Sequence, residues 1–200
     1  MKVYKKAKNL VLIKNIFPES VCSRLHNIVK KEKKWKLIKQ IRPNHYKHVF
    51  KSSSKIMPDK NEVYQANFYK SLNLSENIFI KKSLEKYLPT ILKKLKIKYQ
   101  NINFRCHKFK TNNLMRSHFD HYAGTHSINI NLNKEWKADW GGLLCVLNGK
   151  NFENIETLVP EWNSLNILYS EKNKKSSPHF VTSVQKFAKE PRYSITVFLS

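Results

Sequence analysis

Hydrophobic residues in the first half of the chain recur mainly at helical spacing. A helix is predicted to open at residues 17–20, where Pro18 suits the first helical turn. Its apolar stripe consists of Val21, Leu25, Ile28 and Val29. Two more helices are predicted over residues 61–71 and 75–96, the second continuing through Pro89. We expect these helices to support the fold by packing and not to carry chemistry.

Two other stretches of the first half have strand character. Residues 10–16 are predicted as a short strand. Residues 35–50 have the residue types of a strand but are interrupted by Pro43. An irregular hairpin and a loop are therefore both consistent with this stretch.

From residue 97 onward the pattern changes to short runs with a period of two, which is typical of strands. The predicted strands are residues 102–109, 115–121, 127–132, 142–147, 155–158, 164–169, 179–184 and 193–199. About eight short strands separated by turn signals favour a double-stranded β-helix, or jelly roll. The expected fold is mainly β (α+β) in a single domain. Residues 1–96 would form a helical support layer with edge strands, and residues 97–200 a jelly-roll catalytic core.

The chain is strongly basic. Its 200 residues include 38 Lys and Arg but only 14 Asp and Glu, which gives a formal net charge of +24. Such a charge suggests an anionic partner, such as nucleic acid, a ribonucleoprotein or a membrane surface. Most of the basic residues are lysine, however, and the chain is also rich in Asn and Ile. A compositional bias that leaves a solvated basic surface is therefore the favoured explanation of the charge.

Cysteine usage and the lengths of the apolar runs indicate a reducing compartment. Cys22, Cys106 and Cys145 are widely spaced and form no C-x-x-C pair, so neither a disulfide framework nor a zinc knuckle is supported. No apolar run approaches the roughly 20 residues of a membrane span, and the run at 10–13 is too short for a signal peptide. We therefore expect a cytoplasmic protein without a membrane partner.

The most informative short motif is His118-Phe119-Asp120. Residues two apart on a strand point to the same face, so His118 and Asp120 can bind one metal ion. A second imidazole would complete the set of two histidines and one carboxylate. This set leaves three coordination positions open and is typical of non-haem Fe(II) oxygenases. A hydrogen-bonded surface pair is the alternative that the motif alone leaves open.

Residues further along the chain extend this motif. His179 begins a predicted strand and can supply the second imidazole. Arg192 lies at the last predicted strand, where its planar guanidinium can hold a carboxylate with two hydrogen bonds. Thr196 follows four residues later and faces the same side of that strand. Taken alone, Arg192 would be interpreted as a surface residue.

Six short elements follow one another in the second half of the chain. They are H-F-D (118–120), L-N-K-E-W (132–136), W-G-G-L-L (140–144), P-E-W-N-S-L (160–165), S-P-H-F-V (177–181) and P-R-Y-S-I-T-V (191–197). In order and in most of their spacing they resemble the prolyl 4-hydroxylase-like branch of the Fe(II)/2-oxoglutarate-dependent oxygenases. The resemblance covers roughly residues 102–199 and is strongest to the hypoxia-factor-type prolyl hydroxylases.

The resemblance implies a site and a reaction. His118, Asp120 and His179 would bind Fe(II), and Arg192, helped by Thr196, would pair with the C5 carboxylate of 2-oxoglutarate. With O2, the cosubstrate would be converted to succinate and CO2 while a hydroxyl group is placed on a substrate C–H bond. Ascorbate is a further cofactor that the resemblance allows. The protein itself would orient the C–H bond and exclude water.

Two tyrosines that family members often carry at the cosubstrate are missing here. The position on the strand before the metal motif is matched by His107, with Phe109 as a rival on the same face. The position before L-N-K is matched by Asn131, and Asn129 and Asn131 would both face inward. His107 and Asn131 are therefore expected to contact the cosubstrate. A core histidine bonded to a backbone carbonyl is an equally acceptable interpretation of His107.

Three functions are consistent with these residues. The resemblance implies hydroxylation of a prolyl residue in a protein or peptide, and the second reading is a hydroxylase of a free amino acid or other small metabolite. The loop at 42–59 would distinguish these two, because a mobile lid suits a peptide and a closed pocket suits a metabolite. The third is a non-enzymatic basic module that binds RNA or ribosomes, which the net charge motivates.

Overall fold

Two helices and a twelve-stranded sheet form the fold in the residues that the computed structural model describes, which are 2–7, 10–43, 63–118, 120, 126–148, 153–169 and 178–200. The helices are α1 (Glu19–Lys31) and α3 (Ile78–Lys94), and two short 3-10 turns are η1 (Leu74–Glu76) and η2 (Ala138–Trp140). The strands are β1 (Lys2–Ala7), β2 (Leu10–Lys14), β3 (Trp35–Pro43), β4 (Val63–Ser71), β5 (Ile102–Phe109), β6 (Leu114–His118), β7 (His126–Asn131), β8 (Leu144–Leu147), β9 (Asn154–Leu158), β10 (Ser164–Tyr169), β11 (His179–Val181) and β12 (Arg192–Leu199).

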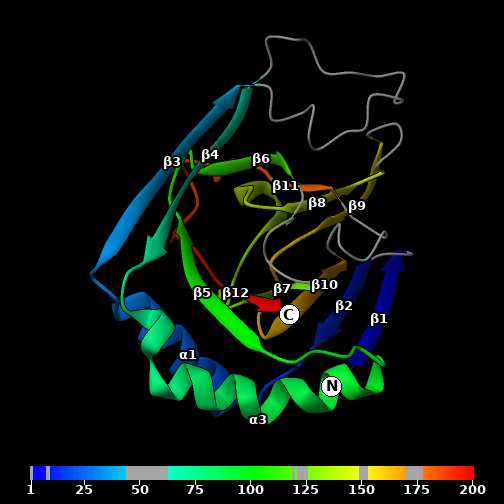
Figure 1. Cartoon of the computed structure of the whole chain (residues 1–200). Helices are drawn as coiled ribbons and strands as arrows, with labels where there is room; N and C mark the ends of the chain where they lie inside the picture. The colour runs from blue at the N-terminus through cyan, green and yellow to red at the C-terminus, as the bar shows by residue number, and fades with distance from the viewer. Residues whose placement is uncertain are drawn as a thin grey trace.

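The strands follow one hydrogen-bonded path that curls into two layers. Their order is β1-β2-β10-β7-β12-β5-β4-β6-β11-β8-β9, with β3 paired to β4, and every pair is antiparallel. In Figure 1 the strands β6, β11, β8 and β9 lie above β12, β7 and β10, so the sheet turns back over itself. This arrangement confirms the predicted jelly roll with supporting helices.

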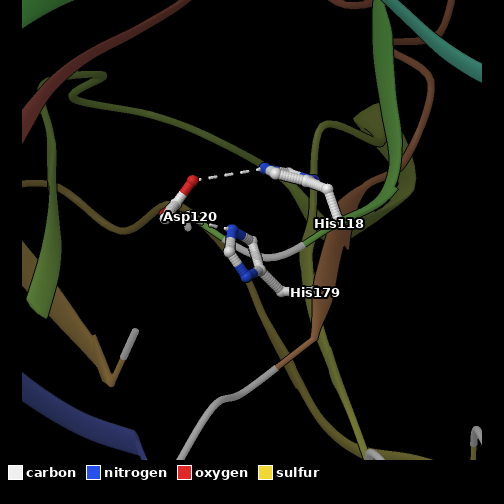
Figure 2. Close-up of side chains that lie close together, drawn as sticks. All are labelled: His118, Asp120 and His179. Atoms are coloured by element: carbon white, nitrogen blue, oxygen red, sulfur yellow. Dashed lines mark ion pairs between the residues drawn. The ribbon is translucent and has the colours of Figure 1, made fainter. Parts of the chain in front are cut away.

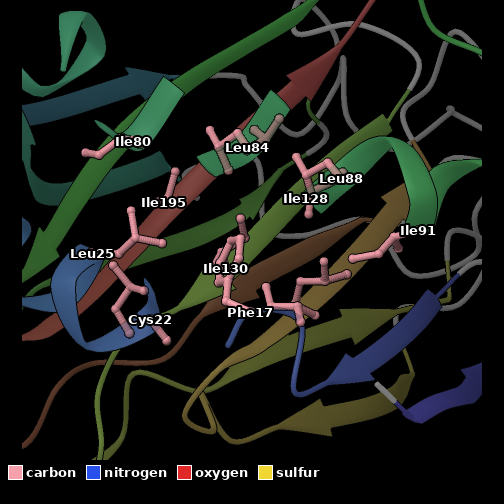
Figure 3. Close-up of a cluster of buried hydrophobic side chains, with 14 of the residues drawn as sticks. Phe17, Cys22, Leu25, Ile80, Leu84, Leu88, Ile91, Ile128, Ile130 and Ile195 are labelled. Carbon is pink, nitrogen blue, oxygen red and sulfur yellow. The ribbon is translucent and has the colours of Figure 1, made fainter. Parts of the chain in front are cut away.

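Both helices pack against the outer face of the layer that contains β7 and β12 (Figure 1). Their apolar side chains meet the outward-facing residues of β7 and β12 (Figure 3). The labelled members of this cluster are Phe17, Cys22, Leu25, Ile80, Leu84, Leu88, Ile91, Ile128, Ile130 and Ile195. Because each fully buried large apolar side chain contributes about 1.5–3 kcal/mol, this contact is a major source of stability. It leaves the inner face of the same strands free to carry polar residues.

Local sequence signals set the ends of the helices. The Asn77 side chain caps α3, because its Oδ1 accepts a hydrogen bond from the Ile80 N–H at 3.1 Å. In α1, Glu19 lies in the first turn and Lys30 in the last, as the helix dipole favours. Among the described residues, no helix is both long enough and apolar enough to cross a membrane.

The helix predicted over residues 61–71 is wrong, because the structure forms strand β4 there. Buried Ala66 and Phe68 alternate with half-buried Asn67 and Tyr69, which is the period of a strand. β4 pairs along its whole length with β3 and also bridges β5 and β6. This non-local pairing decides the conformation, and it assigns residues 35–43 to a strand. Residues 44–62, which include most of the expected substrate loop, lie outside the described part of the chain.

Strand β1 was not predicted from the hydrophobic pattern. Its residues 2–7 pair antiparallel with β2, and β2 in turn pairs with β10. Residues from the first half of the chain therefore join the sheet at two places: β1 and β2 form one end of the strand order, and β4, paired to β3, lies between β5 and β6. The strands predicted from residue 102 onward all form, with ends shifted by a few residues.

Candidate active site

Two histidines and an aspartate meet between the two layers of the sheet. His118 ends β6 and His179 begins β11, and these two residues are direct partners in the antiparallel β6–β11 pair. Asp120 follows two residues after His118, just beyond the end of the strand. The ligand atoms of the three side chains all lie within 4.8 Å of one another. The sequence prediction that these three residues converge therefore agrees with the structure.

The three side chains point toward a common centre (Figure 2). The Nε2 atom of His118 lies 3.6 Å from Oδ1 of Asp120, and the Nε2 atom of His179 lies 3.6 Å from Oδ2. The two imidazole rings have their centroids 4.4 Å apart. Two nitrogen donors and one carboxylate on one side of a point form the ligand set that suits ferrous iron and leaves other positions open.

A backbone contact holds the His118 ring in a suitable tautomer. Nδ1 of His118 donates a hydrogen bond to the carbonyl oxygen of Arg116 at 2.9 Å. With the proton on Nδ1, the lone pair of Nε2 is directed to the side of Asp120. Metal-binding histidines commonly have their second nitrogen fixed in this way, so the contact fits a ligand role.

The carboxyl group of Asp120 is held in its charged form. Burial by itself raises the pKa of this group, but the attraction of His179 and His118 and a hydrogen bond of Ser127 lower it more strongly. The net pKa of Asp120 lies below its usual value. A carboxylate that stays charged at neutral pH is ready to bind a cation.

A cavity of about 270 Å³ opens beside these three residues. Its polar lining comes mainly from the inner faces of β5, β7 and β12, and its apolar lining includes Phe68, Phe109, Leu144 and Val181. The volume lies near the lower end of the range of small-molecule sites, roughly 300–1,000 Å³. The cavity therefore suits a small, polar molecule that reaches the histidines and the aspartate.

Arg192 is a buried cation in the wall of this cavity. The residue is only 2% exposed, and no carboxylate of the described residues forms an ion pair with it. Its Nε atom has no hydrogen-bond partner among those residues, and the guanidinium carbon lies 5.3 Å from the centre of the Phe109 ring. Burial lowers the pKa of Arg192 to about 10, which leaves it charged at neutral pH. A buried charge without a partner is costly, and an anionic ligand would relieve that cost.

Three hydrogen-bonded side chains line the same cavity as Arg192. Thr196 Oγ1 donates a hydrogen bond to Oδ1 of Asn129 at 2.9 Å and lies 3.0 Å from Nδ1 of His107. Because the hydroxyl has a single proton, Nδ1 of His107 is the donor to Thr196. Burial, and then the positive charges of Arg105 and Arg192, lower the pKa of His107 to about 3. His107 is therefore a neutral histidine that lines the cavity, not a core histidine bonded to a backbone carbonyl.

Asn131 is not brought into the cavity lining. It is fully buried, and its Nδ2 donates a hydrogen bond to Ser164 Oγ at 3.0 Å. Its Oδ1 has no hydrogen-bond partner among the described residues. Asn131 pairs with Ser194 of β12, whereas Asn129 pairs with Thr196 and lines the cavity. The expected inward orientation holds for both amides, but the position along β7 makes Asn129 the one that lines the cavity.

The sequence prediction omits other residues of the lining. Strand β12 contributes Arg192, Ser194, Thr196 and Phe198, of which only the first and third are predicted. Strand β5 contributes Arg105 beside His107. The period of two along each strand was the signal that could have identified them.

A pair of glycines shapes the wall behind Arg192. Gly141 and Gly142 both have positive φ, 70° and 62°. A Cβ atom on Gly141 would lie 2.0 Å from the carbonyl oxygen of Ser183, and one on Gly142 would lie 3.1 Å from Cδ of Arg192. Only glycine fits this close turn into β8.

The second half of the chain matches a known family. Residues 104–200, just under half of the chain, match the family model of the 2OG-Fe(II) oxygenase superfamily. This part of the chain is similar to members of that superfamily, which use Fe(II), 2-oxoglutarate and O2. The resemblance drawn from the sequence is confirmed at this level. No curated protein matches the sequence.

Solved structures share the fold over nearly the whole chain. A Trichoplax adhaerens prolyl hydroxylase, in complex with a peptide fragment of the hypoxia inducible factor oxygen degradation domain, has a TM-score of 0.64 at 16% identity, covering 96% of this chain and 84% of its own. A Pseudomonas putida prolyl-4-hydroxylase has a TM-score of 0.60 at 12% identity, covering 96% and 91%. A viral collagen prolyl hydroxylase from Paramecium Bursaria Chlorella virus-1 has a TM-score of 0.56 at 14% identity, covering 96% of both chains. At such identities the likeness concerns the fold.

The residues present fit the two groups that this family uses. The imidazole and carboxylate donors converge within 4.8 Å, as one metal ion requires. The orphaned Nε atom of Arg192 lies in the wall of the same cavity and fits a carboxylate of a small dicarboxylic acid.

Proposed function

We propose that this chain is an Fe(II)- and 2-oxoglutarate-dependent hydroxylase that acts on a prolyl residue of a protein or peptide. In this proposal His118, Asp120 and His179 hold the iron, and Arg192 holds the distal carboxylate of the cosubstrate. Residues 97–200 would form the catalytic core and residues 1–96 the support layer that keeps its strands in place.

One observation carries the proposal above all others. The guanidinium of Arg192 is buried and positively charged, and it has no acidic partner among the described residues. It lines the same cavity as the side chains of His118, Asp120 and His179. A buried cation at one part of a cavity and three converging metal donors at another are the features needed to bind a small dicarboxylate that also reaches a metal.

The side chains of this protein have separate tasks in the proposed reaction. When bound, the iron and the cosubstrate supply the oxidative decarboxylation and the hydroxylation of the substrate C–H bond. The Nε2 atoms of His118 and His179 and the carboxylate of Asp120 donate to the metal. Arg192 fixes the distal carboxylate through charge-assisted hydrogen bonds.

Three further polar residues would complete the cosubstrate site. The Thr196 hydroxyl donates to Asn129 and accepts from His107, so it would turn its proton from Asn129 to the carboxylate of the cosubstrate. His107 stands where family members often have a tyrosine. In this protein the neutral imidazole of His107, acting through the Thr196 hydroxyl, would therefore replace the phenol of that tyrosine. Asn131, buried against Ser164, is assigned a positioning role on β7 and not a direct contact.

The prolyl and peptide parts of the proposal are supported by the structural neighbours. Three of them are prolyl hydroxylases, and the one from Trichoplax adhaerens was solved with a peptide fragment. A free amino acid or other metabolite is the alternative substrate for the same iron site. Most of the loop expected to distinguish the two, residues 42–59, lies outside the described part of the chain, so an experiment has to decide.

Mass spectrometry tests the substrate class directly. Proline-containing peptides and a pool of free amino acids are incubated separately with the protein, Fe(II), 2-oxoglutarate and O2. The proposal predicts one added oxygen on a prolyl residue of a peptide and stoichiometric succinate, both absent with His179→Ala. An added oxygen on a free amino acid alone would favour the metabolite reading. Failure to turn over 2-oxoglutarate with either pool would contradict both.

A further inference from the structure

Three cations form a row at the rim of the candidate active site. Lys36 of β3 lies directly opposite Lys70 of β4, and Lys70 lies opposite His107 of β5. Arg105 is two residues from His107 and so faces the same side of β5. Lys70 is also two residues from Phe68, which lines the catalytic cavity. The inner face that carries the catalytic side chains thus continues into a positively charged rim.

This row has no acidic partner among the described residues. No ion pair joins a carboxylate to Lys36, Lys70 or Arg105 in that part of the structure. Burial, followed by the charges of Arg105 and Lys36, lowers the pKa of Lys70. Like charges placed directly opposite each other on neighbouring strands destabilise a sheet. An acidic ligand would remove this repulsion.

A groove next to the row gives such a ligand room. It has a volume of about 510 Å³ and is lined by Lys70, Lys81 and Arg105, with apolar surface from Ile102 and Phe198. Arg105 and Phe198 also line the catalytic cavity, so the groove and the cavity share a wall. A chain lying in the groove would therefore lie beside the catalytic cavity.

The groove also runs along an open strand edge. β4 pairs with β5 only through Tyr69 and Lys70, opposite Lys108 and His107. Residues 102–106 of β5 pair with β12 on one side and have no strand partner on the other among the described residues. An extended peptide can form backbone hydrogen bonds with such an edge, whereas a nucleic acid cannot continue a sheet.

We propose that this groove, together with Lys36 beside Lys70, binds an extended acidic segment of the polypeptide substrate, with its carboxylates at Lys36, Lys70 and Arg105. The inference deepens the proposed function, on which it rests for the identity of the substrate as a polypeptide. It assigns part of the chain's positive charge to substrate recognition.

Fluorescence anisotropy with a pair of labelled peptides tests the inference. One proline-containing peptide carries four Glu residues, and its counterpart carries Gln at the same positions. Both are titrated with the full chain at 150 mM salt, where long-range charge effects are screened beyond about 8 Å. No iron or cosubstrate is present, so failure here is distinguishable from failure of the hydroxylase proposal, which is tested by turnover.

The wild-type chain should bind the Glu peptide about five times more tightly than the Gln peptide, as two or three solvent-accessible ion pairs allow. The double variant Lys36→Gln/Lys70→Gln should lose this preference. The control Lys39→Gln/Lys82→Gln removes the same charge from β3 and α3 outside the groove and should retain it. Lys70→Glu should shift the preference toward a peptide with Lys at the same positions, a gain that misfolding cannot produce.

Other results would overturn the inference. Equal losses in the groove variant and the control variant would show that only the overall charge attracts the peptide. No preference for the Glu peptide over the Gln peptide in the wild type would also overturn the inference, because the groove would then not recognise acidic side chains. A labelled single-stranded oligoribonucleotide is titrated in parallel. If the groove variant loses affinity for the RNA and not for the Glu peptide, the groove is a nucleic-acid site.

Discussion

Replacing Arg192 with methionine should weaken 2-oxoglutarate binding and stabilise the cosubstrate-free protein at the same time. Methionine has a similar reach but no charge, so the packing against Phe109 is largely kept. The stability gain follows from the cost of burying the guanidinium. Burial lowers the pKa of Arg192 from 12.5 to about 10. At about 1.4 kcal/mol for each pH unit, this corresponds to roughly 3 kcal/mol against the charged form.

The lowered pKa of Arg192 decides whether removing its charge stabilises or destabilises the folded protein. The pKa of Arg192 is lower in the folded chain than in the unfolded chain, so the penalty on the charged form is fully present below about pH 10. It therefore acts at pH 7, and removing the charge relieves it. The affinity loss has the opposite cause, because the carboxylate of the cosubstrate loses its partner. Removing one member of a buried charge pair costs about 2–5 kcal/mol, or roughly 30- to 5,000-fold in affinity.

Two measurements check both halves of this prediction. Urea unfolding of the metal-free protein at pH 7 gives the change in the free energy of unfolding, and calorimetric titration of 2-oxoglutarate into the Mn(II)-loaded protein gives the affinity. Arg24→Met is the matched control, since Arg24 is exposed and lies over the Phe79 ring at 4.0 Å, outside the cavity. It should change the affinity little and should not stabilise the fold. Unchanged cosubstrate affinity in Arg192→Met, or a clear loss of stability, would refute the assigned role.

Three other substitutions test the metal site, the hydrogen-bonded chain and the glycine turn. His179→Ala should abolish tight Fe(II) binding in anaerobic equilibrium dialysis, because two ligands rarely hold iron in an open site; a variant that still binds iron tightly would remove His179 from the metal site. His107→Gln should flatten the acid dependence of stability. The unfolded histidine takes up a proton below about pH 6.5, whereas buried His107 stays neutral down to about pH 3. The wild type should therefore lose roughly 2 kcal/mol more than the variant between pH 7 and pH 5 in urea titrations, and parallel losses would show that His107 is not the group responsible. Gly141→Ala should destabilise the protein by at least about 1–3 kcal/mol because of its positive φ and the clash with the Ser183 carbonyl, and an unchanged unfolding midpoint would contradict that geometry.

The sequence was sufficient where a local pattern and the fold agree. The strands of the second half show a period of two over short runs, and each forms close to its predicted place. The helix after Pro18 carries a regular apolar stripe, and the core uses Leu25 and Val29 from it. In these segments the face that is apolar in the sequence is also the face that the fold buries.

The sequence was insufficient where distant strands decide the structure. Residues 63–71 have a composition that suits either helix or strand, and pairing with β3, β5 and β6 selects the strand. β1 contains too few apolar residues to stand out and is formed by pairing with β2. For β4 the determining contacts come from segments far away in the chain, whereas β1 pairs with the strand that directly follows it.

In the candidate site, too, some features follow from local sequence patterns and others depend on the pairing of strands. The motif at 118–120 indicated two ligands, and the family resemblance indicated His179 and Arg192 from distant strands. The structure brings these four residues to one cavity. The choice between Asn129 and Asn131 depends on the register between β7 and β12, which no local pattern specifies. Sequence alone could therefore predict the chemistry of the site but not all of its lining.

Anaerobic titration of the protein with Fe(II) and 2-oxoglutarate tests the central claim most directly. The account predicts a weak visible charge-transfer band that saturates at one equivalent of each, is absent with His179→Ala and requires far more 2-oxoglutarate with Arg192→Met. Absence of the band in a folded wild-type protein, or an unchanged band in His179→Ala, would contradict the claim that these side chains form an Fe(II) and 2-oxoglutarate site.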